Sequence, residues 1–395
     1  MLNKKIPIMI PWMGEEEAAA ARRPIMSGWT TQGPEVAAFE KEFAEIAGAK
    51  YACAVSNCTT ALHLALKAVG VKAGDEVITV SHSFIATANA IRYCNATPVF
   101  VDIEPHTFNI DATLIERAIT ERTKAILCVH QIGMPCDLKA IIEIAKHHSL
   151  FVIEDAACAI GSEILWDGKW EKIGKPRGDI ACFSFHPRKL ISIGDGGMIT
   201  TLNAEWDKRF RLWRQHSMDV PDTVRHKANE VIFESYADLG YNYRLTDIQA
   251  AVGREQLKRL KAIIERRRMM AERYRESLSR FTGFVLPEEL SWARSNWQSY
   301  CVRLPAHCDQ RTVMQKMLEA GISTRRGVMC IHREPAYPKD LWSCGGEPCE
   351  CDNGTCNRLM QSELAQDRSI LLPLFHQMTE ADQEFVVEKL REACA

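Results

Sequence analysis

Ser184-Phe185-His186-Pro187-Arg188-Lys189, continued by Gly194-Asp195-Gly196-Gly197, is the stretch that decides the fold. The apolar run at residues 180–185 has the length and composition of a buried strand in a parallel sheet. A Pro turn ends that strand, and a Gly-rich corner leads to a second apolar run at 198–201. Lys189 therefore lies on a loop just past the carboxyl end of a strand, where open α/β sheets bind their ligands.

A second buried strand, Phe151-Val152-Ile153-Glu154-Asp155, ends in an acidic pair. A lysine alone on such a loop is usually a solvated side chain, but a lysine and an aspartate at neighbouring strand ends suit a pyridoxal phosphate enzyme. The amine forms a Schiff base with the cofactor aldehyde, and the carboxylate keeps the ring nitrogen protonated. The pattern predicts Lys189 and Asp155 as the catalytic pair.

Length and composition indicate a globular protein with two hydrophobic cores. The chain has 395 residues, of which 46% are hydrophobic and 25% charged. A net charge of −2 without a basic block argues against nucleic acid as a partner, and no apolar run approaches the roughly 20 residues of a membrane helix. Most of the 15 cysteines lie singly inside apolar runs, which is typical of a reduced, cytoplasmic protein.

Strand and helix patterns alternate along the first half of the chain. We predict strands at 51–55, 76–80, 97–102, 124–130 and 150–155, with helices at 15–26, 34–47, 59–69, 83–93 and 137–148. Such alternation favours a mostly parallel sheet with right-handed crossovers. The charged residues 206–234 are predicted to form an irregular surface excursion.

A long helix predicted at 246–279 should bridge two lobes. A strand at 299–304 and helices at 310–320 and 379–393 follow it. The overall prediction is an α/β protein with a large domain at 1–250, in which helices flank a mostly parallel sheet. A smaller α/β domain at 251–395 includes a Cys-rich loop at 344–356.

The joint between the strand at 51–55 and the next helix carries hydroxyl groups and free backbone N–H groups. Such a helix N-terminus binds phosphate, although N-capping by Ser56 or Asn57 explains the same residues. Phe84, just after a strand end, suits stacking on a flat ring, and core packing is the alternative.

Taken together, these segments resemble the DegT/DnrJ/EryC1/StrS family of pyridoxal-phosphate-dependent sugar aminotransferases, which have the aspartate-aminotransferase fold (fold type I). The motifs that carry the resemblance are Ser27-Gly-Trp-Thr-Thr-Gln-Gly-Pro34, Gly74-Asp-Glu-Val77, Ala86-Thr-Ala-Asn-Ala90, Thr97-Pro-Val-Phe-Val-Asp102, Ile153-Glu-Asp-Ala-Ala157, Ser184-Phe-His-Pro-Arg-Lys189, Gly196-Gly197, Gly240-Tyr-Asn-Tyr-Arg244 and Leu372-Pro373-Leu374.

The resemblance implies a role for each residue that matches a family motif. Lys189 would be the Schiff-base lysine and Asp155 the partner of the pyridine nitrogen. Phe84 would stack on the ring, and the phosphate would be held by Thr59, Thr60 and Ser184. Asn242 would reach the phosphate of the cofactor in the neighbouring subunit, which implies a homodimer with shared active sites.

Two positions depart from the family pattern. The family usually has Gln three residues past the aspartate, bonded to the ring hydroxyl, whereas this chain has Cys158. A thiol is a poor hydrogen-bond partner, so the hydrogen bonding of the ring hydroxyl should differ from that in the family. The common Ser-Gly-Thr phosphate turn is here Asn57-Cys58-Thr59, which keeps the hydroxyl and the amides.

The predicted reaction is transfer of an amino group from an amino acid, by resemblance L-glutamate, to a nucleotide-linked keto sugar. We expect desolvation and the nearby cofactor to keep the Lys189 amine neutral enough to act as a base. By family analogy the sugar pocket would use residues from two segments. These are Trp29 and Thr30, and Arg325, His332 and Tyr337. Alternatively, Trp29 packs down in a capped linker, and Arg325 belongs to a solvated surface pair.

Two other functions share this cofactor. Sugar dehydratases of the superfamily replace the lysine by His, so Lys189 argues against that activity, although one kind carries a cysteine-ligated iron–sulfur cluster. A non-catalytic, cofactor-binding regulator adds a DNA-binding segment, for which we expect no room before the first family motif.

Four cysteines gather where the resemblance lapses, at Cys344, Cys349, Cys351 and Cys356. Their neighbours are turn-forming and charged, so the burial that explains the other cysteines does not apply. The grouping predicts a local metal site, most simply structural zinc, although the spacing differs from the usual two-residue knuckles. An exposed reduced loop and a disulfide are the alternatives.

Overall fold

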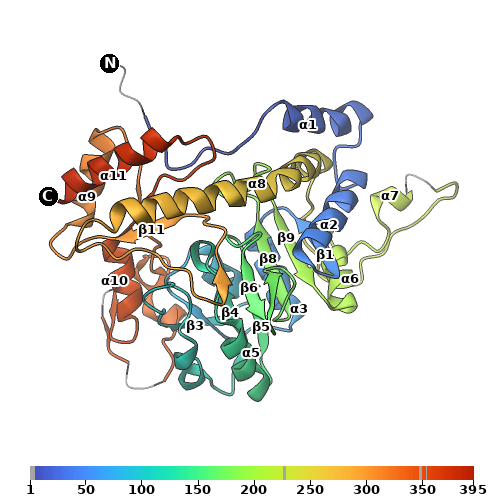
Figure 1. Cartoon of the computed structure of the whole chain (residues 1–395). Helices are drawn as coiled ribbons and strands as arrows, with labels where there is room; N and C mark the ends of the chain where they lie inside the picture. The colour runs from blue at the N-terminus through green and yellow to red at the C-terminus, as the bar shows by residue number, and fades with distance from the viewer. Residues whose placement is uncertain (1–4, 226–227, 347–348, 353) are drawn as a thin grey trace.

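A seven-stranded sheet forms the centre of the larger part of the molecule (Figure 1). The structure is a computed structural model that describes residues 5–225, 228–346, 349–352 and 354–395. In chain order the strands are β1 (Tyr51–Val55), β2 (Glu76–Val80), β3 (Thr97–Val101), β4 (Thr123–Val129), β5 (Phe151–Asp155), β8 (Ile180–Ser184) and β9 (Gly197–Thr201). They lie in the order β1-β9-β8-β5-β4-β2-β3.

The sheet is mostly parallel, as predicted. Strands β3, β2, β4, β5 and β8 run parallel to one another, whereas β9 is antiparallel to both of its neighbours. The parallel strands bring the carboxyl ends of β5 and β8 to one edge, so Asp155 and the loop that carries Lys189 share that edge.

Helices cover both faces of this sheet, and alternate residues of each strand point to opposite faces. The helices of the first part of the chain are α1 (Glu15–Ser27), α2 (Pro34–Ala47), α3 (Cys58–Ala68), α4 (Ala86–Tyr93) and α5 (Leu138–His147). In β1, Ala52 and Ala54 join a core with α2 and α5, and Cys53 and Val55 join one with α3 and α4. The result is a three-layer α/β architecture.

Residues 206–213 depart from the prediction of an irregular segment. They belong to α6 (Ala204–Trp213), which Asn203 caps by accepting from two backbone N–H groups. The charged residues hide an apolar face, since Phe210 and Trp213 are buried. Arg211 also binds the buried carboxylate of Glu40, with 2.6 Å between Nη1 and Oε2. A short helix, α7 (Asp222–Arg225), follows on the arm at the right of Figure 1.

The helix α8 (Asp247–Leu278) has 32 residues and runs along the molecule from the side of α1 and α2 toward the C-terminal helices (Figure 1). The predicted bridging helix is therefore confirmed, and the expected boundary between residues 250 and 251 falls inside it. Thr246 caps its N-terminus in a capping box with Gln249. Of the helices in the described ranges, none has both the length and the apolarity that crossing a bilayer requires.

A second core gathers around a three-stranded sheet in the order β11-β15-β12. Its elements are β11 (Tyr300–Arg303), β12 (Arg325–Arg326), β15 (Ser369–Leu372), α9 (Gln310–Glu319) and α11 (Glu380–Cys394). The N-terminal segment also belongs here, because Ile6 pairs with Ile322 in a parallel bridge.

The remaining elements are short. They are the strands β6 (Glu163–Trp166), β7 (Lys169–Lys172), β10 (Ala293–Arg294), β13 (Cys351–Asp352) and β14 (Thr355–Cys356), the helix α10 (Met360–Arg368), and the 3-10 turns η1 (Ala112–Leu114), η2 (Glu116–Ala118), η3 (Gln131–Gly133), η4 (Ile331–Arg333) and η5 (Lys339–Leu341). The Cys-rich loop lies beside the edge strand β3 of the large sheet, where the N–H of Phe100 donates to the carbonyl of Ser343.

Candidate active site

A cavity of about 840 Å³ opens at the carboxyl ends of β4, β5 and β8. The first turn of α3 and the loop after β2 form one side of it, and residues 325–329 beside the second sheet form the other. Its position matches the crevice in which open α/β sheets bind ligands. The volume suits a molecule the size of a cofactor together with part of a substrate.

Asp155 lies buried in this cavity at the end of β5, with 5% of its surface exposed. Its Oδ2 accepts from the Thr87 hydroxyl at 2.9 Å, and its Oδ1 accepts from the backbone N–H of Ala157 at 3.2 Å. Burial raises the pKa of the Asp155 carboxyl, although both hydrogen bonds and the nearby Lys189 act in the opposite direction. The carboxylate is thus fixed in place, and a cationic partner in the cavity would stabilise its charged form.

Lys189 lines the same cavity from the turn that follows β8. Its backbone N–H donates to the carbonyl of His186 at 2.8 Å, which holds the turn, and its Nζ lies 3.0 Å from the Sγ of Cys158. Burial by itself lowers the pKa of the Lys189 amine, but Cys158, Cys58 and Asp155 raise it more. In the chain alone these contacts outweigh desolvation, and the expectation that desolvation together with the bound cofactor keeps this amine neutral stays a prediction.

The first turn of α3 lies beside Ser184, and Thr59, Thr60 and Ser184 all line the cavity. Asn57 caps this helix, because its Oδ1 accepts from the Thr60 N–H at 2.9 Å. The Thr60 hydroxyl in turn donates to the Asn57 carbonyl at 2.7 Å. Capping and an anion site coexist here, since the first N–H groups of a helix have no partner within it.

Gly197 of β9 allows the close approach that forms this cradle. A Cβ at this position would lie 2.5 Å from the carbonyl carbon and oxygen of Asn57. Only a residue without a side chain lets the strand and the helix N-terminus come this near.

Of the other predicted cofactor residues, two line the cavity and one does not. Phe84 lines the cavity, and 62% of its surface is exposed, so its ring is available for stacking. Cys158 also lines the cavity, next to Lys189. Asn242 is exposed and lies outside the described lining of this cavity.

The predicted substrate residues are not brought together. Arg325 lines the cavity. His332 is buried with its ring between Ser81 and Glu363, and the buried Tyr337 donates its hydroxyl to Asn89 at 2.7 Å. Trp29 and Thr30 lie outside the lining that the described residues form.

Several lining residues have no counterpart in the prediction. Gln298 donates from Nε2 to the carbonyl of Arg188 at 2.5 Å and so ties the second lobe to the Lys189 turn. Tyr243 and His130 face the cavity as well. Tyr243 lies in a quoted family motif, which was the available signal, whereas no local pattern singles out Gln298.

The donor set of the cavity fits pyridoxal phosphate. Asp155 is a fixed, buried anion for a protonated ring nitrogen, and Lys189 supplies an amine for the aldehyde. Phe84 offers an exposed ring face, and the N-terminus of α3 with Thr59 offers donors to a dianionic phosphate.

The four predicted metal ligands lie outside this cavity. The ligand atoms of Cys344, Cys349, Cys351 and Cys356 all lie within 4.8 Å of one another, so the structure does bring them together. Cys344 and Cys349 are joined as a disulfide.

The model of the DegT/DnrJ/EryC1/StrS aminotransferase family matches residues 11–391. The spore coat polysaccharide biosynthesis protein SpsC of Bacillus subtilis is 36% identical over 396 residues, covering 99% of this chain and 97% of SpsC.

Two solved structures extend the likeness to the fold. The aminotransferase TlmJ from Streptoalloteichus hindustanus superposes with a TM-score of 0.87 at 30% identity, over 99% of both chains. Helicobacter pylori PseC, an aminotransferase involved in the biosynthesis of pseudoaminic acid, gives a TM-score of 0.87 at 25% identity, also over 99% of both chains.

Proposed function

Because the chain belongs to the DegT/DnrJ/EryC1/StrS aminotransferase family, a family of pyridoxal-phosphate-dependent sugar aminotransferases, we propose that it moves an amino group from L-glutamate to the keto carbon of a nucleotide-linked sugar. The observation that carries this proposal is the pairing of Lys189 with the buried Asp155 in one cavity.

Each residue of the site has a task in this reaction. Pyridoxal phosphate supplies an electron-accepting ring that stabilises negative charge at the substrate carbon. Asp155 holds the proton on the ring nitrogen, which its burial and its fixed hydrogen bonds favour. Lys189 would hold the cofactor through its amine and, as a free amine, would take the proton from the donor α-carbon. With the acceptor sugar, Lys189 returns a proton to the carbon that receives nitrogen.

Arg325 is the proposed contact for the acceptor. Arg325 lines the cavity with the neighbouring residues 326–329, and a guanidinium pairs with a phosphate group through two parallel hydrogen bonds. Trp29 and Thr30 are proposed to contact the sugar from another part of the assembled protein. For His332 and Tyr337 we propose a supporting role, since both are buried and hydrogen-bonded away from the cavity.

We propose a homodimer in which Asn242 completes the partner's site. The arm that precedes Asn242 exposes apolar side chains, among them Val231 at 84% and Phe233 at 90%. Exposure of that kind marks a protein–protein contact. Mixing inactive Lys189→Ala and Asn242→Ala chains should restore activity, because one site of a hybrid dimer is intact. No recovery after verified subunit exchange would count against a shared site.

Cytoplasmic location is part of the proposal. Cys53, Cys128, Cys182 and Cys301 are buried and free, a state that persists where thiols stay reduced.

The test of the reaction is a mass-spectrometric screen of keto-sugar nucleotides with ¹⁵N-glutamate. The expected product has C=O replaced by CH–NH₂ and carries the label. Loss of a hydroxyl group without nitrogen uptake would indicate a dehydratase instead, and cofactor binding without turnover of any sugar would indicate a regulator.

A further inference from the structure

The cysteine cluster of Cys344, Cys349, Cys351 and Cys356 is built from two separate turns. Cys351 and Cys356 face each other as direct partners across the β13–β14 pair, with 2.9 Å between their sulfurs. Cys349 precedes this hairpin, and Cys344 follows the segment that pairs with β3. The chain thus folds back on itself to bring four sulfurs to one point.

The spacing of the sulfurs suits one tetrahedral ion. With metal–sulfur bonds of about 2.3 Å, the sulfurs of a tetrahedral site lie about 3.8 Å apart. The Cys344–Cys351 and Cys349–Cys356 distances are 3.8 and 3.9 Å, and Cys349–Cys351 is 2.8 Å. The Cys349–Cys351 and Cys351–Cys356 pairs need to open by about 1 Å around an ion of this size, and the bonded Cys344–Cys349 pair must first be reduced to two thiols. An iron–sulfur cluster, which places inorganic sulfide between its ligands, needs a wider ring of cysteines.

The surroundings suit a charged centre better than an ordinary core. A surface hollow of about 470 Å³, lined by Cys351, Cys356 and Glu363, gives an ion a path to the sulfurs. The Arg358 guanidinium donates to the carbonyl of Gly345 and places a positive charge beside the cluster. That charge offsets part of the net −2 of a zinc tetrathiolate.

A disulfide alone does not account for four converging thiols. The Cys344–Cys349 bond uses two sulfurs, and its Cα–Cα separation of 7.0 Å is at the upper limit of what disulfides bridge. Cys351 and Cys356 remain free thiols in contact with that pair. In a reducing compartment all four cysteines are thiols available as ligands.

We propose that Cys344, Cys349, Cys351 and Cys356 bind one zinc ion as four thiolates, with release of their four protons to solvent. A complete set of four thiolates leaves no open position, so the site is structural.

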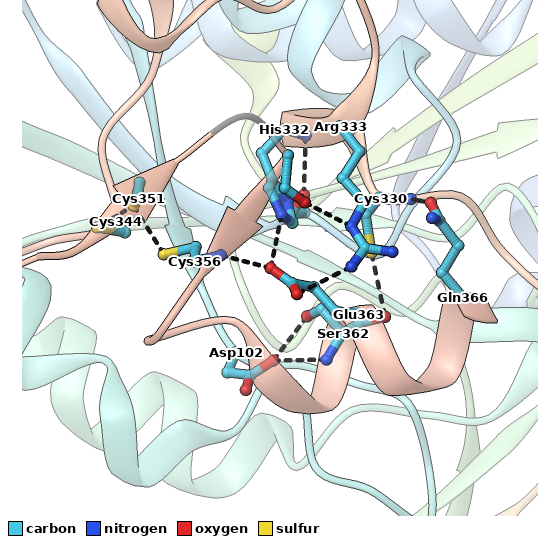
Figure 2. A network of polar contacts seen from close by, with 12 residues as sticks. Asp102, Cys330, His332, Arg333, Cys344, Cys351, Cys356, Ser362, Glu363 and Gln366 are labelled. Atoms are coloured by element: carbon cyan, nitrogen blue, oxygen red, sulfur yellow. Dashed lines mark hydrogen bonds and ion pairs between the residues drawn. The ribbon is translucent and has the colours of Figure 1, made fainter. Parts of the chain in front are cut away.

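The zinc site steadies one wall of the active-site cavity, through the network in Figure 2. The Cys356 N–H donates to Glu363 at 2.6 Å, and Glu363 also binds the His332 ring at 3.1 Å and the Arg333 guanidinium at 2.9 Å. The His332 ring is bonded in turn to Ser81 at 2.6 Å.

This network ends next to the cavity. His332 and Arg333 belong to η4, which only Cys330 separates from the cavity-lining residues 325–329. The first turn of α10 is fixed independently, since Asp102 accepts from the N–H groups of Gln361 and Ser362, both at 2.8 Å. Loss of the ion should remove the Cys356 N–H from the Glu363 carboxylate and so loosen the hold of Glu363 on residues 325–333, while α10 and the Lys189 side of the cavity stay in place.

The test uses the full-length, cofactor-loaded protein purified under reducing conditions without added metal. We expect about one zinc and less than a tenth of an iron per chain. Cys351→Ser should lose the zinc, whereas Cys94→Ser, at a half-buried free cysteine, should keep it. In the wild type, the four thiols should resist alkylation by iodoacetamide until a chelator removes the ion. This measurement does not depend on the folding of any variant.

Four results would overturn the proposal. They are less than about a tenth of an equivalent of metal with freely alkylated thiols, iron in place of zinc, a persistent Cys344–Cys349 disulfide in the reduced preparation, and a Cys351→Ser variant with full zinc content. Hydrogen exchange tests the coupling separately: residues 325–333 should exchange faster in Cys351→Ser than in Cys94→Ser, and equal rates would refute it.

Discussion

Replacing Cys158 by Ala should make the cofactor-free chain capture pyridoxal phosphate faster at neutral pH. The wild-type Lys189 amine has a raised pKa, and the contact between Nζ and the Cys158 sulfur at 3.0 Å is the leading cause that opposes burial. Only the neutral amine attacks an aldehyde, so a higher pKa means a smaller reactive fraction at a given pH.

The magnitude follows from the strength of this contact. A hydrogen bond to a charged group contributes about 1.5–3 kcal/mol, and one pKa unit corresponds to about 1.4 kcal/mol. Sulfur is a weak acceptor and Lys189 is only half-buried, so we take the lower end of that range. Cys158→Ala should then lower the pKa of the Lys189 amine, and losing about 1.5 kcal/mol of stabilisation of the charged form would raise the neutral fraction at pH 7.5 about tenfold.

Stopped-flow absorbance, on mixing cofactor-free protein with pyridoxal phosphate between pH 6.5 and 10, measures this effect. The rate for Cys158→Ala should be about tenfold higher at pH 7.5 and should level off at a lower pH than the wild-type rate. Cys94→Ala should match the wild type because Cys94 lies outside the described cavity lining. Coinciding rate–pH curves for Cys158→Ala and the wild type would refute the assigned cause of the raised pKa.

Asp155→Asn should bind the cofactor yet lose about a thousandfold in kcat, because a neutral amide does not hold the ring nitrogen protonated; steady-state rates at saturating cofactor measure this, and a loss below tenfold would contradict the role. Gly197→Ala should weaken cofactor binding about tenfold or more, since its Cβ would lie 2.5 Å from the backbone at the N-terminus of α3. Equilibrium titration with pyridoxal phosphate checks this against Gly14→Ala, where the nearest atom is a flexible side chain at 3.4 Å. Phe233→Glu should dissociate the proposed dimer in sedimentation velocity, whereas Leu318→Glu, also on an exposed side chain, should not; a dimer that persists with Phe233→Glu would exclude the arm from the interface.

The sequence was most informative where buried strands end in polar residues. The runs that end at Asp155 and Ser184 are apolar because helices cover both faces of the sheet. The position and the end of each strand could therefore be read from the sequence. Since parallel strands end at one edge, the sequence predicted that Asp155 and Lys189 lie near each other, and the structure pairs β5 with β8. The long helix α8 was predictable as well, because Thr246 and Gln249 form a complete capping box.

Features that depend on contacts between distant segments were not predictable. The charged residues of α6 suggested an irregular surface segment. The contact that orders Arg211 could not be foreseen, because its buried partner Glu40 lies 171 positions earlier in the chain. His332 was assigned to the substrate, yet its ring is taken by Ser81 and Glu363, neither of which is near it in sequence. The raised pKa of Lys189 likewise required the position of Cys158, which no local pattern contains.

The covalent bond between Lys189 and the cofactor is the most direct test of the account. The purified holoprotein is reduced with borohydride and digested, and its peptides are analysed by mass spectrometry. We expect one pyridoxyl phosphate group per chain on Lys189, and Lys189→Ala should retain the fold but lose turnover by several powers of ten. A modified lysine elsewhere, or wild-type turnover in Lys189→Ala, would contradict it.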